Sequence, residues 1–369
     1  ADIITMDPLV SRAEAIAIKD GLVLAAGSNL EIDGLVGPGT DICDAHGATL
    51  LPGLQDTHIH LQDGGLDLAQ NAPLWDVRSE SELIAALQRH AQKYSGPFVI
   101  GTGWQPGVFT DANLTRHVLD QAVSDRPLMV YDSGYHNACL NTKACEIIGA
   151  VKGVADPLNG HFVRDTAGVP TGMLHEDACY FARERLPGRT EDDFYEGLMA
   201  GQAHCNEHGI TGVLDAQVMD RHCNVYSRAE KAGKLTVRVA ATAMVYARET
   251  LDETLQRLRR YRASYHSDLF KVHSAKFFLD GVLENRTAAM LEPYSDELAG
   301  NAPLMFAPQQ ILDWFTAIDA ERFQIHVHVI GDHAIRAALD GMEAARKANG
   351  DWPSLHQLAH VQVIDPADI

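Results

Sequence analysis

The sequence predicts an α/β fold made of parallel βα units. Apolar, strand-like segments alternate with amphipathic, helix-like segments from Ile210 to the end of the chain. The strand-like segments are 210–216, 235–245, 270–281, 323–332 and 355–360, and the helix-like segments are 222–234, 249–265, 308–321 and 333–350. This alternation is typical of a doubly wound sheet or of a (β/α)8 barrel. With a further strand just after Pro52, the sequence offers six barrel strands, two fewer than closure requires.

The N-terminal region has a different character, typical of a small domain built from β-strands. Residues 13–27 form two alternating apolar runs that meet at Asp20 and Gly21, a pair suited to the type I′ turn of a hairpin. This character extends to Pro52. We therefore expect 1–52 to form part of a separate small β domain and 53–369 to form the barrel.

A long segment separates the first predicted barrel strand from the second. One helix starts after a capping box at Ser79 and Glu82, and another runs from Thr190 to Gly209. The whole segment is too long for one crossover between parallel strands. We therefore expect 62–189 to form an inserted subdomain over the mouth of the barrel.

The composition argues against several classes of partner. The formal charge of −20 repels phosphate backbones and anionic lipids, so we expect neither nucleic acid nor a membrane as partner. With no 18-residue apolar stretch and no signal-peptide pattern, we expect a cytoplasmic protein. The six cysteines lack a CxxC pair and are expected to be reduced. A homodimer is expected only because twofold assemblies are common.

The end of the sequence carries the start signal of a helix. Asp365 is placed as a cap, Pro366 stands at the first helical position, and Asp368 follows in the first turn. We therefore expect the sequence to be a fragment of a longer protein.

Four of the 18 histidines stand at the ends of predicted strands. His58 and His60, in "LPGLQDTHIHL", are two residues apart, so their side chains leave a strand on the same face, about 6.6 Å apart. His328 and His360 occupy corresponding positions on two other strands. The carboxyl ends of the strands form the catalytic face of a βα barrel, where converging imidazoles can hold a metal ion. The alternative is that these imidazoles only form hydrogen bonds in a polar cleft.

Lys276 lies between Ala275 and two phenylalanines in a strand that is otherwise apolar. A buried ammonium is costly, so this lysine is expected to find a partner or to lose its proton. One interpretation is an ion pair with Asp280. The other is that the neutral amine captures carbon dioxide and becomes a carbamate, a ligand long enough to bridge two ions.

The chain resembles the amidohydrolase superfamily of metal-dependent hydrolases, in particular the branch of amidohydrolase family 3 and the N-substituted formamide deformylases. The resemblance runs essentially from end to end. It is carried by "IITMDP", "AEAIAIKDGLVLAAGS", "LLPGLQDTHIHL", "GTGWQPG", "GYHNACLNTKACEIIG", "GITGV", "KFFLDGVLENRTAAMLEPY", "HVHVIGDHAIRAALDGME" and "LAHVQVIDPADI". It implies a (β/α)8 barrel, incomplete in this chain, with 1–52 as the first part of a small β-sandwich.

The resemblance also implies a metal centre. His58 and His60 would hold one ion, His328 and His360 a second, and a carbamate on Lys276 would bridge the two. The ions are expected to be zinc, with a hydroxide between them that attacks an amide or formamide carbonyl and releases the nitrogen. The family's aspartate on the eighth strand is expected to lie beyond this sequence. No residue is therefore assigned as general base.

Four further residues are expected to line the substrate cavity. Trp104 and His136 belong to stretches that resemble the family, although an aromatic anchor and a hydrogen-bonded core histidine are equally compatible with the sequence. Asp280 and Arg286 follow the fourth strand. Arg286 could bind an anionic group of the substrate or pair with a neighbouring acid.

A second histidine motif suggests a different enzyme. "HCNEH", residues 204–208, matches the H-x-x-E-H motif of a zinc peptidase. It occupies the last helical turn before a strand, which is the face of a barrel opposite the catalytic mouth. We therefore expect His204 and His208, like His222 and His266, to be surface residues, and His326 to lie one layer deeper than His328. A barrel that binds without catalysing is the remaining alternative.

Overall fold

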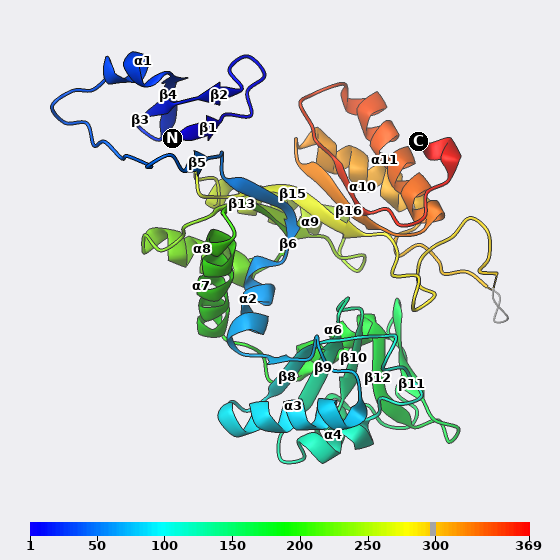
Figure 1. Cartoon of the computed structure of the whole chain (residues 1–369). Coiled ribbons are helices and arrows are strands. Elements are labelled where there is room, and N and C mark those ends of the chain that lie inside the picture. Colours follow the sequence, from blue (N-terminus) through cyan, green and yellow to red (C-terminus); the bar gives the residue numbers. More distant parts are fainter. Residues whose placement is uncertain (296–299) are drawn as a thin grey trace.

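Six parallel strands form the central sheet of the computed structural model, which describes residues 1–295 and 300–369. Figure 1 shows their arrangement. The strands are β6 (Leu54–Ile59), β13 (Ile210–Val218), β14 (Arg238–Met244), β15 (Phe270–Phe278), β16 (Gln324–Val329) and β17 (Gln357–His360). Their spatial order, β17-β16-β15-β14-β13-β6, follows the chain order. A doubly wound sheet would reverse its strand order at a switch point. The sheet is therefore barrel-like and nearly closed, and all six predicted strands are confirmed.

Helices between the strands in sequence cover the outside of this sheet (Figure 1). They are α7 (Glu191–Glu207), α8 (Asp220–Lys231), α9 (Leu251–Ser264), α10 (Pro308–Ala320) and α11 (Asp332–Asn349). The core between helices and strands is rich in aromatic rings: the Phe277 ring of β15 lies 4.9 Å from that of Phe315 and 5.4 Å from that of Phe306. Because all six strands run parallel, their carboxyl ends lie at one edge of the sheet, where the site forms.

A second six-stranded sheet is formed by the segment between β6 and β13, and it lies below the parallel sheet in Figure 1. Its strand order is β11-β12-β10-β9-β8-β7. The strands are β7 (Ala72–Pro73), β8 (Val99–Trp104), β9 (Leu128–Asp132), β10 (Asn137–Leu140), β11 (Gly160–Arg164) and β12 (Pro170–Glu176), and the helices are α3 (Glu80–Lys93), α4 (Arg116–Ala122), α5 (Thr142–Ile148) and α6 (Asp177–Arg185). Ser79 caps α3 as predicted, but the Glu82 carboxylate accepts from the backbone of Arg78, so half of the predicted capping box forms.

Helix α2 (Leu61–Ala69) connects β6 to this second sheet and packs closely on α7. A Cβ atom placed on Gly65 would come within 1.8 Å of the carbonyl oxygen of Gly197. The glycines therefore allow the two helix backbones to touch. Since α2 begins directly after His60, this contact also fixes the start of the helix beside the histidines.

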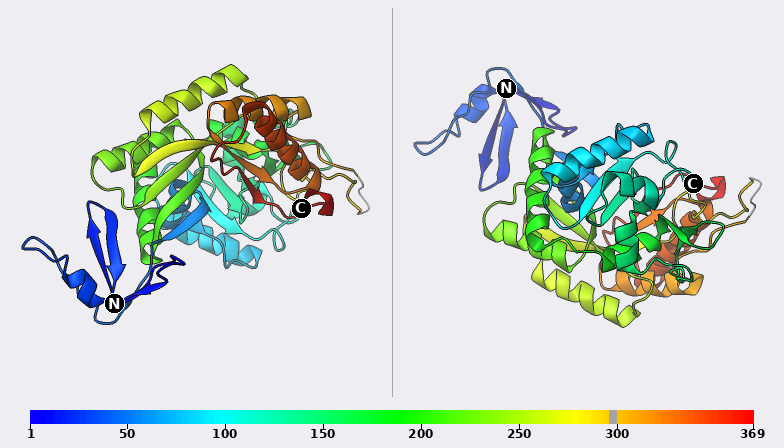
Figure 2. Two further views of the ribbon diagram at one scale, coloured as in Figure 1. Left: turned by 90° about the horizontal axis from the view of Figure 1, so that it is seen from above. Right: turned by 90° about the horizontal axis from the view of Figure 1, so that it is seen from below.

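The N-terminal strands form two small sheets that stand apart from the rest of the chain (Figure 2). One contains β1 (Asp2–Ile4), β2 (Arg12–Ala13) and β5 (Thr49–Leu50), the other β3 (Ala15–Lys19) and β4 (Leu22–Gly27), and α1 (Asn29–Asp33) follows. Asp20 and Gly21 have φ angles of 53° and 77°, as the predicted type I′ turn requires. The proposed sandwich, like the boundaries of the predicted domains, stays a prediction.

Candidate metal centre

The register of the parallel strands brings together the four histidines that stand at strand ends. Ring centroids lie 5.8 Å apart for His58 and His60, 5.1 Å for His58 and His360, and 4.6 Å for His328 and His360. These residues come from the ends of β6, β16 and β17 and from the residue that precedes α2. Imidazoles that are more than 300 positions apart in sequence thus form one cluster, which we call the histidine cluster.

Burial keeps the imidazoles of the histidine cluster neutral. Burial, reinforced by the positive charge of Lys276, lowers the pKa of His58 from 6.5 to about 3. Burial also lowers the pKa of His60 and of His360 to about 4, and it lowers the pKa of His328 well below its usual value. Neutral imidazole is the form that binds a metal ion.

Lys276 is buried next to the histidine cluster, with 1% of its surface exposed. Burial lowers its pKa from 10.5 to about 7, so much of the side chain is a neutral amine at neutral pH. Its Nζ lies 4.8 Å from the centroid of the Phe278 ring, and no ion pair joins it to any carboxylate in the described part of the chain. An uncharged, unpartnered amine is the form that reacts with carbon dioxide.

Asp280 is fully buried and does not pair with Lys276. Its carboxylate accepts backbone N–H groups from Ile330 at 3.0 Å, Gly331 at 2.8 Å and Ala289 at 3.0 Å. These bonds hold the loops that follow β15 and β16. The geometry therefore favours a role in fixing the loops, and it does not support the sequence interpretation in which Asp280 neutralises the lysine.

His328 has a free nitrogen that fits a metal ion. Its Nε2 donates to the carbonyl oxygen of Gly281 at 3.1 Å, so Nδ1 carries a lone pair, and Nδ1 is buried without a hydrogen-bond partner in the described residues. Within 1–295 and 300–369, no three His, Cys, Asp or Glu side chains are already arranged around an ion, so side chains must rotate to coordinate one. The number and kind of donors suit a divalent cation such as zinc.

A model of the amidohydrolase family matches residues 41–369. The chain belongs to the amidohydrolase family. It is 28% identical to the putative amidohydrolase YtcJ of Bacillus subtilis (strain 168), covering 96% of this chain and 66% of that protein. It is 24% identical to the N-substituted formamide deformylase of Arthrobacter pascens, with 95% and 66% covered. The chain thus spans just under two thirds of the length of either relative.

A solved structure has the same architecture as this amidohydrolase chain. It is that of an uncharacterized metal-dependent hydrolase from Pyrococcus furiosus, with a TM-score of 0.72 and 25% sequence identity over 99% of this chain and 72% of that one. The match supports a metal-dependent hydrolase fold for the region that carries the histidine cluster.

The second sheet of the amidohydrolase chain contributes His136 to the edge of the cluster. The ring of His136 lies 5.3 Å from that of His328, and its Nδ1 lies 2.7 Å from Oε2 of Glu176. Glu176 is 6% exposed, has a positive φ of 51°, and accepts from the Thr287 hydroxyl at 2.7 Å. The sequence predicts His136 but not Glu176, for which the only signal is a carboxylate at the end of an apolar strand.

The other two predicted substrate residues have different surroundings. Trp104 is 2% exposed and packs in the core of the second sheet, with its ring 6.3 Å from that of Phe109, which favours the interpretation as an aromatic anchor. Arg286 is half-buried with a φ of 57°, and its guanidinium carbon lies 4.7 Å from the centroid of the Tyr294 ring. Contact of Arg286 with a substrate stays a prediction.

The four histidines predicted to lie at the surface are found in two different environments. His204 and His208 are exposed in the last turn of α7, with rings 4.4 Å apart, and His266 is exposed as well. The prediction that His222 is a surface residue is wrong. His222 is 2% exposed at the start of α8, and its Nε2 lies 3.2 Å from Oδ2 of Asp63. A residue at the start of the helix that follows β13 lies at the carboxyl end of that strand, which is the face of the sheet that carries the histidine cluster.

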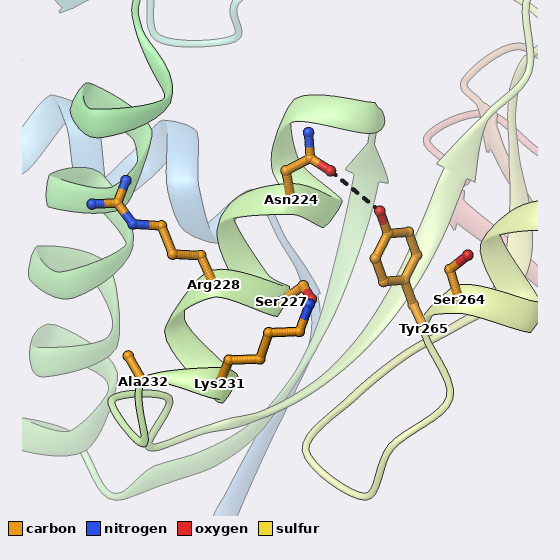
Figure 3. Close-up of a pocket in the computed structure, with 7 residues that line it drawn as sticks. All are labelled: Asn224, Ser227, Arg228, Lys231, Ala232, Ser264 and Tyr265. Carbon is orange, nitrogen blue, oxygen red and sulfur yellow. Dashed lines mark hydrogen bonds between the residues drawn. The ribbon is translucent and has the colours of Figure 1, made fainter.

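A surface pocket of about 640 Å³ lies elsewhere, between α8 and α9 (Figure 3). Asn224, Arg228 and Lys231 of α8 line it, with Ser264 and Tyr265 from the end of α9. The C-terminal ends of barrel helices lie at the face opposite the strand ends that carry the histidine cluster. This pocket is therefore not part of the candidate metal centre.

Proposed function

We propose that this chain is the metal-binding part of a hydrolase that cleaves a carbon–nitrogen bond in a small-molecule amide. The observation that carries the proposal is the histidine cluster, formed by His58, His60, His328 and His360, beside the unpartnered amine of Lys276. Buried polar atoms normally have partners, and strongly shifted pKa values gather at functional sites. Membership of the amidohydrolase family supports hydrolysis as the reaction.

The donors divide into two pairs. His58 and His60 would hold one ion and His328 and His360 a second, with Lys276 bridging them as a carbamate. Bound zinc ions would lower the pKa of water and polarise a carbonyl group. The loops that follow the strands would then hold the ligands in place. At the end of β16, the Asp280 carboxylate supports this role because it accepts the backbone N–H groups of Ile330 and Gly331.

The second sheet would supply the wall of the substrate cavity. His136 reaches the edge of the histidine cluster, and Glu176 holds its Nδ1, which leaves Nε2 to contact a substrate. The printed name of the Arthrobacter relative makes an N-substituted formamide the first substrate to assay. Arg286 would select substrates that carry an anionic group.

The test is a comparison of metal content and amide hydrolysis in the wild type and in Lys276→Met. Methionine fills the volume of the lysine without its nitrogen, so we expect folded protein with fewer than two ions per chain and at least a hundredfold lower turnover. His204→Ala with His208→Ala is the control, and it should keep wild-type metal content and turnover. Loss of activity in the control instead would favour the zinc peptidase, and a folded wild type without metal would favour the non-catalytic barrel.

A further inference from the structure

His326 lies between the histidine cluster and Lys276, but it is not one of the predicted ligands. It is 2% exposed, and its Nε2 lies 3.0 Å from Nδ1 of His58. In the register of β15 and β16 it stands directly opposite Lys276. Paired residues of neighbouring parallel strands point their side chains to the same face, with the strands about 4.8 Å apart. His326 therefore has one neighbour among the proposed ligands on each side.

Metal binding would determine which ring nitrogens of His58 and His326 carry a hydrogen. The Nδ1 of His58 faces His326, so an ion can reach only the Nε2 of His58. A neutral imidazole that gives Nε2 to a metal keeps its hydrogen on Nδ1, and this N–H then donates to Nε2 of His326. His326 must consequently carry its own hydrogen on Nδ1.

The Nδ1 atom of His326 has no partner for that hydrogen. It is buried without a hydrogen bond in the part of the chain that the structure describes. A buried N–H without an acceptor costs about 1–3 kcal/mol. The residue opposite is Lys276, whose amine also has no hydrogen bond or ion pair within the described residues. Two neighbouring groups that both lack partners suggest that an acceptor is added between them.

We propose that His326 is a positioning residue that joins both halves of the metal centre: it orients His58 through Nε2 and donates from Nδ1 to a carbamate oxygen on Lys276. The inference rests on the proposed function, since it assumes the ions and the carbamate. In the step that forms the carbamate, the lone pair of Nζ adds to the carbon of carbon dioxide and a nitrogen–carbon bond forms. One carbon–oxygen π bond breaks and leaves its electron pair on oxygen, and one proton leaves the nitrogen for solvent. Nothing is oxidised or reduced.

Replacing His326 by each of two amide residues tests the contacts of its Nε2 and Nδ1 atoms separately. Glutamine in His326→Gln places a polar atom near the position of Nε2 and none at Nδ1, whereas asparagine in His326→Asn does the reverse. Phenylalanine in His326→Phe removes both nitrogens and keeps a ring. The probes are zinc, counted per chain and titrated against a chelating indicator, and 13C-bicarbonate, whose carbamate carbon is followed by NMR. His204→Phe, at an exposed histidine, is the matched control.

For the zinc affinity of the His58 ion, we expect His326→Asn to weaken binding about 10–100-fold and His326→Gln to weaken it less, because glutamine keeps the contact with His58. For the carbamate signal, we expect the opposite order, with the larger loss in His326→Gln and the smaller loss in His326→Asn. The inference is overturned if His326→Phe keeps wild-type zinc affinity and carbamate signal. It is also overturned if both amide variants lose both properties to the same extent, because His326 then acts only through packing.

The same measurements distinguish this inference from the proposed function. A wild type that binds no zinc refutes the proposed function itself. A wild type that binds two ions but gives no carbamate signal refutes the bond from Nδ1. Circular dichroism melts of all variants show whether each one folds. If His326→Phe does not fold, the comparison of His326→Gln with His326→Asn still tests the two contacts.

Discussion

Glu176 connects three segments that come from different parts of the fold. Its two carboxylate oxygens contact His136 and Thr287, and its backbone N–H donates to the carbonyl oxygen of His136 at 2.8 Å. A non-glycine residue with positive φ costs about 1–3 kcal/mol, which the surrounding contacts must offset. The strained residue thus ties the second sheet to the loop after β15, next to the histidine cluster.

Replacing this carboxylate should change the titration of His136. Burial acts to lower the pKa of His136, but the hydrogen bond and charge of Glu176 outweigh it and raise that pKa above 6.5. Glu176→Gln keeps the shape and removes the charge, so we expect the pKa of His136 to fall. The measurement is an NMR titration of the His136 ring, with Glu184→Gln as the control at an exposed position. An unchanged His136 titration in Glu176→Gln would contradict this account of the pair.

Asp215 should make the stability of the protein depend on pH. Burial raises its pKa from 3.8 to about 7, although the Tyr226 hydroxyl donates to it at 2.5 Å. Between about pH 4 and pH 7 the folded state keeps a proton that the unfolded state has lost, so the free energy of unfolding falls as the pH rises, by up to about 4 kcal/mol. Asp215→Asn should remove this dependence of the free energy of unfolding on pH.

Urea unfolding of the metal-free protein at several pH values between 4 and 7 measures the effect. The wild type and Asp215→Asn should differ in the slope of their unfolding free energies against pH. Parallel curves for the two proteins would show that Asp215 is not protonated in the fold.

At the scale of elements, the packing of α2 on α7 fixes the start of α2 beside His60, one of the proposed ligands. The close approach at Gly65 and Gly197 leaves no room for a side chain, and Gly201 of α7 faces the carbonyl oxygen of Leu61 in the same way. Helix α2 starts after His60, so any separation of the two helices also moves that ligand.

Gly65→Ala should therefore lower both stability and metal affinity. The new methyl group forces the helices apart, which costs about 1–3 kcal/mol in the free energy of unfolding. Gly64→Ala, one residue earlier on the same helix, is the matched control, because a Cβ there meets nothing within 4 Å. We expect the control to be unchanged or stabilised by up to about 1 kcal/mol. Denaturant melts and zinc titrations of both variants provide the comparison, and equal effects at the two positions would refute the packing argument.

Local sequence patterns predicted the elements well but not the contacts between them. Apolar segments that alternate with amphipathic ones located the parallel strands, and α7 begins at Thr190 as predicted, with a capping box that was not predicted. The bond between His326 and His58 depends on strand register across 268 positions, which no local pattern encodes. His222 was wrongly grouped with the residues of the opposite face, although the first turn of a helix that follows a strand lies at the carboxyl end of that strand. The positive φ of Glu176 likewise depends on tertiary contacts.

At the scale of the whole molecule, two sheets meet at the candidate metal centre. The parallel sheet carries the proposed ligands, and the second sheet brings His136 to the cluster edge and Glu176 to the loop after β15. The small N-terminal sheets stand apart from both (Figure 2). No helix in the described residues is long and apolar enough to cross a membrane. Under the proposed function, the parallel sheet would bind the metal and the second sheet would form the wall of the substrate cavity.

The most direct measurement is the anomalous scattering of a crystal grown with zinc and recorded at the zinc absorption edge. The account predicts two strong peaks among His58, His60, His328 and His360, one on each side of Lys276. Strong peaks confined to His204 and His208, or a well-ordered histidine cluster with no peak at all, would contradict it.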